Sequence, residues 1–151
     1  MEEQIFNRTI EFLEKAEIYN DLSNKRNYGD LTTSEVHCID YIGKLEVPNV
    51  TGVSLAMKMT RGGITKLSSK LVKKGYIEKH SIEGNKKEVH LKLTEDGRRV
   101  YIKHEKIHRE AREREAKFFS TFSEKDQKII INFLERLNKF TLTRIEELEE
   151  K

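Results

Sequence analysis

The positive charge of this chain is concentrated in its middle. Between Lys58 and Lys92 there are ten lysines and arginines against three acidic residues, so this segment has a formal charge of +7. The whole chain of 151 residues carries +3, which leaves −4 for the two flanks together. Such an uneven distribution predicts a polyanionic partner for the middle of the chain.

Histidines form a second group whose spacing suits chemistry. His104 and His108 are four residues apart, so on a helix their imidazoles share one face, and two imidazoles at this spacing can bind one Zn²⁺. His37 is a third candidate. The alternative is that His104 and His108 are ordinary members of a charged, exposed helix and that His37 makes a polar contact. His80 and His90 fall on predicted strands and are expected at the surface or near a bound nucleic acid.

The elements that must position these residues begin with two helices. Apolar residues recur every three or four positions from Glu2 to Ser23, which predicts an amphipathic helix. Residues 24–30 lack this periodicity and are expected to form a loop. Thr32 and Glu35 make a capping box that should start a second helix, which runs to about Leu45.

The basic middle of the chain has the pattern of a helix-turn-helix followed by a wing. Two short helices are expected between Thr51 and Gly75, with Thr60 as the N-cap of the second. Short β-prone stretches follow at Tyr76–Ile82 and Val89–Thr94, separated by a turn at residues 83–87. Two helices joined by a tight turn and followed by a basic hairpin are the arrangement of a winged helix-turn-helix.

The second helix of the pair, residues 60–74, and the hairpin carry the side chains suited to DNA. Polar residues lie on the face opposite Ile64, Leu67 and Leu71, and two glycines in the first turn would let backbone amides approach a phosphate. The candidate contacts on this helix are Arg61, Gly62, Gly63, Thr65, Lys66, Ser69 and Lys70. In the wing, residues 77–93, they are Asn85, Lys86 and Lys87, which could reach a minor groove.

The flanking helices complete a mainly α (α+β) fold class. A long, charged helix is expected from Glu95 to about Phe119, and a last helix with an apolar stripe opens at Ser123–Asp126. The first and last helices have more apolar surface than one small domain can cover. A second copy of the chain, related by a two-fold axis, is the expected cover.

The order of several short motifs resembles the MarR family of winged-helix transcription regulators over nearly the whole chain. These motifs are Leu55-Ala56, Ile64-Thr65-Lys66-Leu67, Leu71-Val72-Lys73-Lys74-Gly75-Tyr76-Ile77 and Leu93-Thr94-Glu95-Asp96-Gly97. The resemblance implies a single domain, 1–151, with dimerisation helices at 1–30 and 98–151 around a DNA-binding lobe at 31–97. It also implies a homodimeric regulator, expected to be a repressor, that binds double-stranded DNA at a pseudo-palindromic operator and responds to an effector.

Three residues depart from the family pattern. The wing has Asn85 and Lys87 where family members often carry Asp and Arg, and Lys58 stands in the turn that often holds Gly or Asn. The chain is also similar to the zinc-uptake repressors of this family, because His37, His104 and His108 fall on their histidine positions, with Asp21 as the nearest match for a carboxylate. That similarity implies a zinc ion as effector; the alternative is a small phenolic or drug-like ligand.

Other classes of protein are disfavoured. The sequence has no phosphate-binding glycine loop and no nucleophile elbow. It also has no Cys/His pair with a third, orienting group at a spacing that would indicate a catalytic site, so an enzyme is not expected. Cys38, the single cysteine, excludes an internal disulfide and is expected in the core. No apolar run suits a membrane span and no signal peptide is recognisable, so we expect a cytoplasmic protein with no membrane partner. A helical interaction module whose basic middle binds an acidic protein is the remaining alternative.

Overall fold

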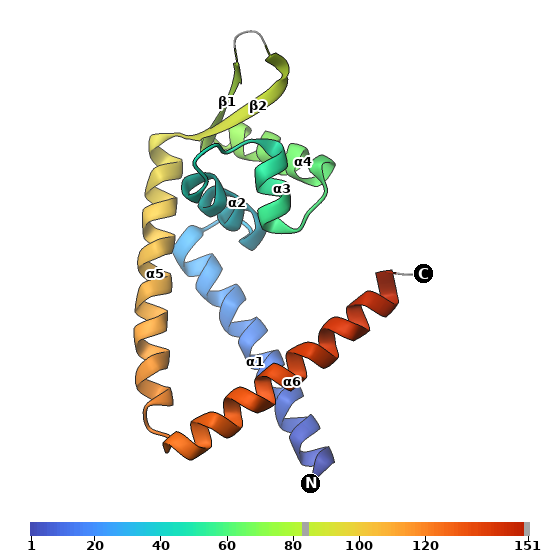
Figure 1. Cartoon of the computed structure of the whole chain (residues 1–151). Coiled ribbons are helices and arrows are strands. Elements are labelled where there is room, and N and C mark those ends of the chain that lie inside the picture. The colour runs from blue at the N-terminus through green and yellow to red at the C-terminus, as the bar shows by residue number, and fades with distance from the viewer. Residues whose placement is uncertain (83–84, 150–151) are drawn as a thin grey trace. The chain divides into compact units, whose positions relative to one another are not determined.

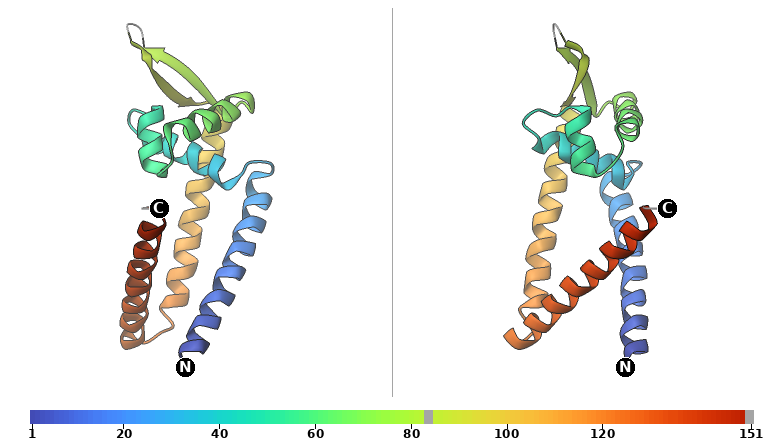
Figure 2. Two further views of the ribbon diagram at one scale, coloured as in Figure 1. Left: turned by 90° about the vertical axis from the view of Figure 1, so that its right-hand side faces the viewer. Right: turned by 45° about the vertical axis from the view of Figure 1, so that its right-hand side comes forward.

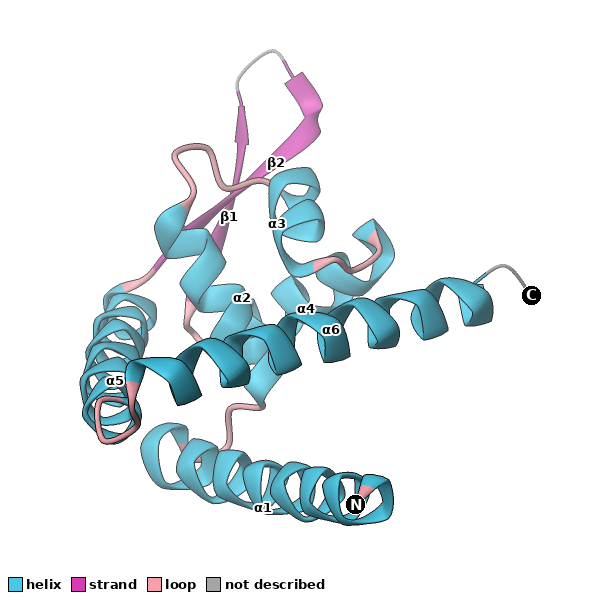
Figure 3. Cartoon of the chain, turned by 60° about the horizontal axis from the view of Figure 1, so that its bottom comes forward, coloured by secondary structure: helices cyan, strands magenta, loops and turns pink. Residues whose placement is uncertain are grey.

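Helices make up most of the chain. The computed structural model describes residues 1–82 and 85–149, with the backbone alone at residues 81, 82 and 85–88. Within these ranges the elements follow in the order α1, α2, α3, α4, β1, β2, α5 and α6 (Figure 1), and the sheet is a single antiparallel hairpin (Figure 3). The chain divides into two compact units, Met1–Lys106 and Ile107–Lys151.

Helix α1 (Glu2–Tyr28) is longer than the sequence predicts. A loop was expected at residues 24–30, which is wrong for residues 24–28. Their amides find partners at the helix end: Asn27 Nδ2 donates to the Ser23 carbonyl (2.9 Å), and Asn24 Nδ2 donates to the Leu31 carbonyl (2.7 Å). The helix stops at Gly29, whose φ of 60° favours glycine. No residue of α1 is buried within the chain.

Helix α2 (Thr33–Lys44) begins with the predicted capping box, which the structure confirms. Thr32 Oγ1 accepts a hydrogen bond from Glu35 N (3.2 Å), and Glu35 Oε2 accepts one from Thr32 N (2.8 Å). The two backbone donors that a helix start would leave unpaired are therefore satisfied. The apolar face of α2 is buried.

The helix-turn-helix is formed by α3 (Val50–Met57) and α4 (Arg61–Lys73), and the wing by β1 (Ile77–Ile82) and β2 (Asn85–Leu93). The hairpin projects away from these helices (Figure 2). Its second strand was expected to begin at Val89, which is wrong. Pairing continues past an irregularity at Ser81/Ile82 to Ile82 opposite Asn85, so β2 starts earlier; residues 83 and 84 of the expected turn lie outside the described residues.

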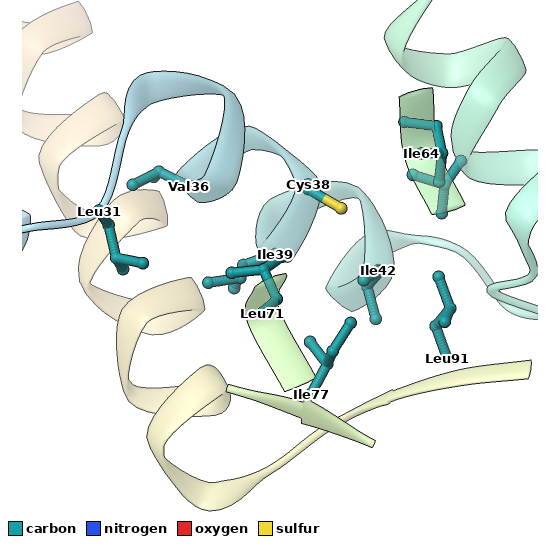
Figure 4. Packing of buried hydrophobic residues seen from close by; sticks show 10 residues of the cluster. Leu31, Val36, Cys38, Ile39, Ile42, Ile64, Leu71, Ile77 and Leu91 are labelled. Atoms are coloured by element: carbon teal, nitrogen blue, oxygen red, sulfur yellow. The ribbon is translucent and has the colours of Figure 1, made fainter. Parts of the chain in front are cut away.

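The core of the first unit lies where α2, α4 and both strands meet. Side chains from these elements converge in Figure 4. Leu91 N donates to the Pro48 carbonyl (2.7 Å), which ties the loop after α2 to the wing. The buried hydrophobic residues are Leu31, Val36, Cys38, Ile39, Ile42, Val53, Ile64, Leu71, Ile77 and Leu91.

A tight joint connects the end of α4 with the start of α5 (Glu95–Phe119). Thr94 Oγ1 donates to the Gly75 carbonyl (2.7 Å) and accepts from Gly97 N (3.1 Å), as an N-cap side chain does. Thr94 N donates to the Tyr76 carbonyl (3.1 Å). A Cβ added at Gly97 would lie 2.0 Å from that carbonyl oxygen, so there is no room for a side chain. The Leu-Thr-x-x-Gly motif is therefore a packing motif.

The second unit contains the end of α5 and helix α6 (Glu124–Glu149). The expected N-cap is confirmed, because Asp126 N donates to Ser123 Oγ (3.2 Å). No residue of α6 is buried, although apolar side chains recur along it. Within the described residues, no helix has both the length and the apolar character required to cross a membrane.

Gly97→Ala should destabilise the fold. Its Cβ would collide with the Tyr76 backbone, so the joint must shift, and we expect a loss of roughly 2–3 kcal/mol in the free energy of unfolding. Urea denaturation at matched protein concentration measures it. Gly62→Ala is the control, because a Cβ there meets nothing within 4 Å and should leave stability unchanged or raised by up to about 1 kcal/mol. Equal stabilities for the two variants would contradict the steric account.

Candidate nucleic-acid interface

The turn between α3 and α4 is made by Lys58, Met59 and Thr60. Lys58 has φ 51° and ψ 42°, a left-handed conformation that explains why Gly or Asn suits this position. The predicted N-cap is confirmed, because Gly63 N donates to Thr60 Oγ1 (3.1 Å). Asn49 caps α3 in the same way, accepting from Gly52 N (2.7 Å). Each helix of the pair therefore has a side-chain cap that defines its start.

Helix α4 has one buried face and one cationic face. Ile64, Ser68 and Leu71 are buried against the core. Its four cations, Arg61, Lys66, Lys70 and Lys73, are all exposed, and α4 contains no acidic residue. Of the predicted DNA contacts, Arg61, Gly62, Thr65, Lys66 and Lys70 are exposed, and Gly63 and Ser69 are half-buried. The structure therefore places all seven outside the core, as a groove-binding helix requires.

Two of the predicted contacts already have partners within the protein. Thr65 Oγ1 donates to the Arg61 carbonyl (2.8 Å), and Ser69 Oγ donates to the Thr65 carbonyl (2.8 Å). Their hydroxyl hydrogens are therefore engaged, so toward a ligand both hydroxyls could act only as acceptors. Arg61, Lys66 and Lys70 remain the donors suited to base edges or phosphates.

Sequence reasoning missed Lys79, which joins the wing to α4. Its Nζ donates to Ser69 Oγ (2.9 Å), so a strand residue reaches the exposed side of the recognition helix. One signal was available: Lys79 is two residues after the buried Ile77 and hence on the same face of β1. The predicted wing contacts Asn85, Lys86 and Lys87 lie in β2, and their side chains lie outside the described residues.

The histidines are only partly brought together. The ring centroids of His37 and His104 lie 5.6 Å apart, and Tyr28 also contacts His104, with its OH 2.9 Å from Nδ1. Burial, with the nearby charge of Asp40, raises the pKa of Tyr28 to about 12. The phenol therefore stays protonated near neutral pH and can donate to Nδ1. His104 is only 6% exposed, so the alternative of an ordinary exposed residue is wrong for it.

Of the four predicted zinc ligands, His37 and His104 lie close together. Asp21 lies on the exposed surface of α1, and His108, four residues after His104 on α5, is exposed. Among the residues the structure describes, no three histidine, cysteine or acidic side chains lie close enough to share a metal ion. The zinc site stays a prediction.

A small cavity lies at the end of α2, beside β2 and the start of α5. Its volume is about 220 Å³, and its walls are both apolar and charged. Tyr101 lies against Gly43, where an added Cβ would come within 2.7 Å of the ring. Two cations, Lys92 and Arg98, and one carboxylate, Glu46, line this cavity. Apolar walls with an excess of positive charge suit a small organic anion.

Cys38 is a core residue, as expected. It is fully buried on α2, and burial, with the charge of Glu35, raises the pKa of its thiol to about 12. A thiolate is therefore not available near neutral pH. This burial argues against Cys38 as a ligand or redox sensor in the folded protein.

Comparison with known proteins places this arrangement among helix-turn-helix regulators. No known family profile matches the chain. It is 38% identical over 104 residues to the HTH-type transcriptional regulator PchR of Bacillus subtilis (strain 168), covering 69% of this chain and 62% of that protein. It is 32% identical over 114 residues to the uncharacterized HTH-type transcriptional regulator YhjH of the same strain, covering 76% and 63%. The match thus spans less than two thirds of these relatives.

Two solved structures have a similar fold over almost the full length of this chain. Streptococcus pneumoniae FabT, in complex with DNA, has a TM-score of 0.76 and 26% identity, covering 95% of this chain and 99% of that one. Lactococcus lactis ZitR, a zinc-responsive MarR family member, has a TM-score of 0.75 and 20% identity, covering 91% and 99%. The second likeness shows the fold alone.

Cys38 should resist alkylation in the folded protein. We expect no labelling by iodoacetamide near pH 7.5, because the thiol is buried and protonated, and one label per chain after unfolding in urea. Mass spectrometry counts the labels. Labelling of the native protein at the rate of a free thiol would contradict the placement of Cys38 in the core.

Proposed function

The chain belongs to the MarR family of winged helix-turn-helix proteins, and we propose that it is a homodimeric DNA-binding repressor of transcription. The observation that carries the proposal is the acid-free, cationic face of α4, held outward by a buried apolar face. In this proposal α4 enters the major groove and the wing contacts the neighbouring minor groove. The relatives support the class of function, since they are transcriptional regulators and one neighbour is bound to DNA.

The proposal of a dimer rests on the exposed apolar side chains of α1 and α6. Neither α1 nor α6 buries a residue within the chain, and contiguous exposed apolar surface of this kind marks an interface. Residues 1–30 and 98–151 would then form the dimerisation helices, and residues 31–97 the DNA-binding lobe. Two lobes related by a two-fold axis require a pseudo-palindromic operator, with half-sites about one helical turn, roughly 34 Å, apart. The exposed apolar residues of α1 include Ile5, Phe6, Phe12, Leu13, Ile18 and Leu22.

The effector is proposed to act on the first unit, at one of two places beside α2. The contact between His37 and His104 supports a metal ion of the zinc type, whereas the cavity lined by Lys92 and Arg98 supports a small phenolic or drug-like ligand. Titration of operator binding distinguishes the two.

Substituting Lys66 should weaken specific binding more than non-specific binding. Lys66→Ala removes a donor from the exposed face of α4, and we expect affinity for an operator selected from random DNA to fall by about tenfold or more. Gel-shift assays with operator and random DNA, over a series of salt concentrations, measure both. Lys128→Ala is the matched control, because Lys128 is an exposed lysine on α6 paired with Glu124.

Equal losses on both DNAs would make Lys66 a phosphate contact. If the wild-type protein showed no retention on any DNA at low salt, the proposed function would be wrong and the interaction module would be favoured. A steep loss of affinity with salt is expected for a DNA-binding protein, because lysines and arginines displace counterions from phosphates.

Metal dependence is tested by adding zinc and then a chelator to the operator complex. If zinc is the effector, operator binding should rise with zinc, fall on chelation, ignore magnesium at the same concentration and lose its zinc response in His104→Ala. A protein that ignores zinc and chelator but releases DNA on addition of a phenolic acid would refute the metal effector. That outcome would favour the cavity beside Arg98.

A further inference from the structure

The last cation of the recognition-helix segment points back into the protein. Lys74, the C-cap residue of α4, places its Nζ 2.8 Å from Glu35 Oε2 and 3.2 Å from the Asp30 carbonyl oxygen. Asp30 lies between α1 and α2, and Glu35 lies in the first turn of α2. One ammonium group therefore joins three segments: the end of α4, the α1–α2 connection and the start of α2.

The acceptor of this contact is a buried carboxylate. The Glu35 side chain is 4% exposed, and the same Oε2 that accepts from Lys74 also accepts from Thr32 N (2.8 Å). Burial alone would raise the pKa of Glu35, but the bonds from Lys74 and Thr32 outweigh it and leave that pKa below its usual value. Removing Lys74, whose own side chain is 37% exposed, would leave the Glu35 carboxylate buried and poorly compensated, so the contact favours this position of the α4 end.

Neighbouring bonds tie the same end of α4 to both long helices of the first unit. Gly75 and Tyr76, which follow α4, accept hydrogen bonds from Thr94 at the start of α5. On the other side, Asn24 of α1 donates to the Leu31 carbonyl beside Asp30. The C-terminal end of α4 is thus fixed to segments that lead into α1 and α5, while its cationic face is left for a ligand.

We propose that Lys74 is a positioning residue, which sets the direction of the recognition helix relative to α1 and does not contact DNA. The inference rests on the proposed function. In a dimer held together through α1, the direction of α4 in each protomer determines the separation of the two recognition helices. Lys74 would then govern which half-site spacing the protein prefers. Lys73, the preceding exposed lysine, has no ion pair with any side chain that the structure describes.

The experiment compares operators whose half-site spacing is shortened or lengthened by one base pair. For the wild type we expect a clear preference for the selected spacing. Lys74→Met should reduce affinity for that spacing by about tenfold and weaken the preference, while the dependence on salt stays as in the wild type. Lys73→Met is the control for the loss of one lysine from α4: affinity should fall alike for every spacing, and the spacing preference should equal that of the wild type.

Glu35→Gln provides an independent variant, because its amide oxygen can still accept from Thr32 N but loses the charge that holds Lys74. Like Lys74→Met, this variant should weaken the preference for the selected spacing. If circular dichroism shows that Lys74→Met is unfolded, Glu35→Gln alone tests the proposal. An unchanged preference in the folded variants, or a shallower salt dependence in Lys74→Met, would overturn the proposal. Failure of the wild type to bind any DNA would instead refute the proposed function.

Discussion

The burial of one face of α4 is the constraint on which the rest of this structure depends. Ile64 and Leu71 are completely inaccessible to solvent, and they pack into a cluster shared with α2 and both strands. Because a helix repeats every 3.6 residues, burying these positions forces Lys66 and Lys70 outward. The same packing that stabilises the lobe therefore assembles the charged surface, and a loosened core would disturb both.

The core is small for the length of the chain, because the helices α1 and α6 contribute no residue to it. The buried hydrophobic residues all lie between Leu31 and Leu91, whereas α1 and α6 contribute none. The charged pairs along α5 and α6, such as Arg99 with Glu95, are exposed and add little to stability. The lobe is thus held by its own core, whereas the apolar side chains of α1 and α6 stay exposed within the chain, which is the basis of the proposed dimer.

Much of the lobe could be predicted because its signals are local. The capping box at Thr32 and Glu35 and the N-cap at Thr60 each depend on residues three positions apart, which are visible in the sequence. Contacts between distant segments were not visible. Nothing in the sequence near Lys74 indicates Glu35, and Lys79 was counted only as one more cation. The prediction of a loop at residues 24–28 was wrong for a physical reason. Asparagines often end helices, but in this chain their side-chain amides donate hydrogen bonds to carbonyls around the helix end.

The joint between Tyr76 and Gly97 has a consequence for how such chains are recognised. Thr94 is there because its hydroxyl must bridge two segments, and Gly97 because a carbonyl oxygen occupies the space of its missing side chain. Neither residue is among the exposed side chains of α4. Identical residues at this motif therefore indicate a common architecture between two proteins and carry no information about what the exposed face of α4 binds in either of them.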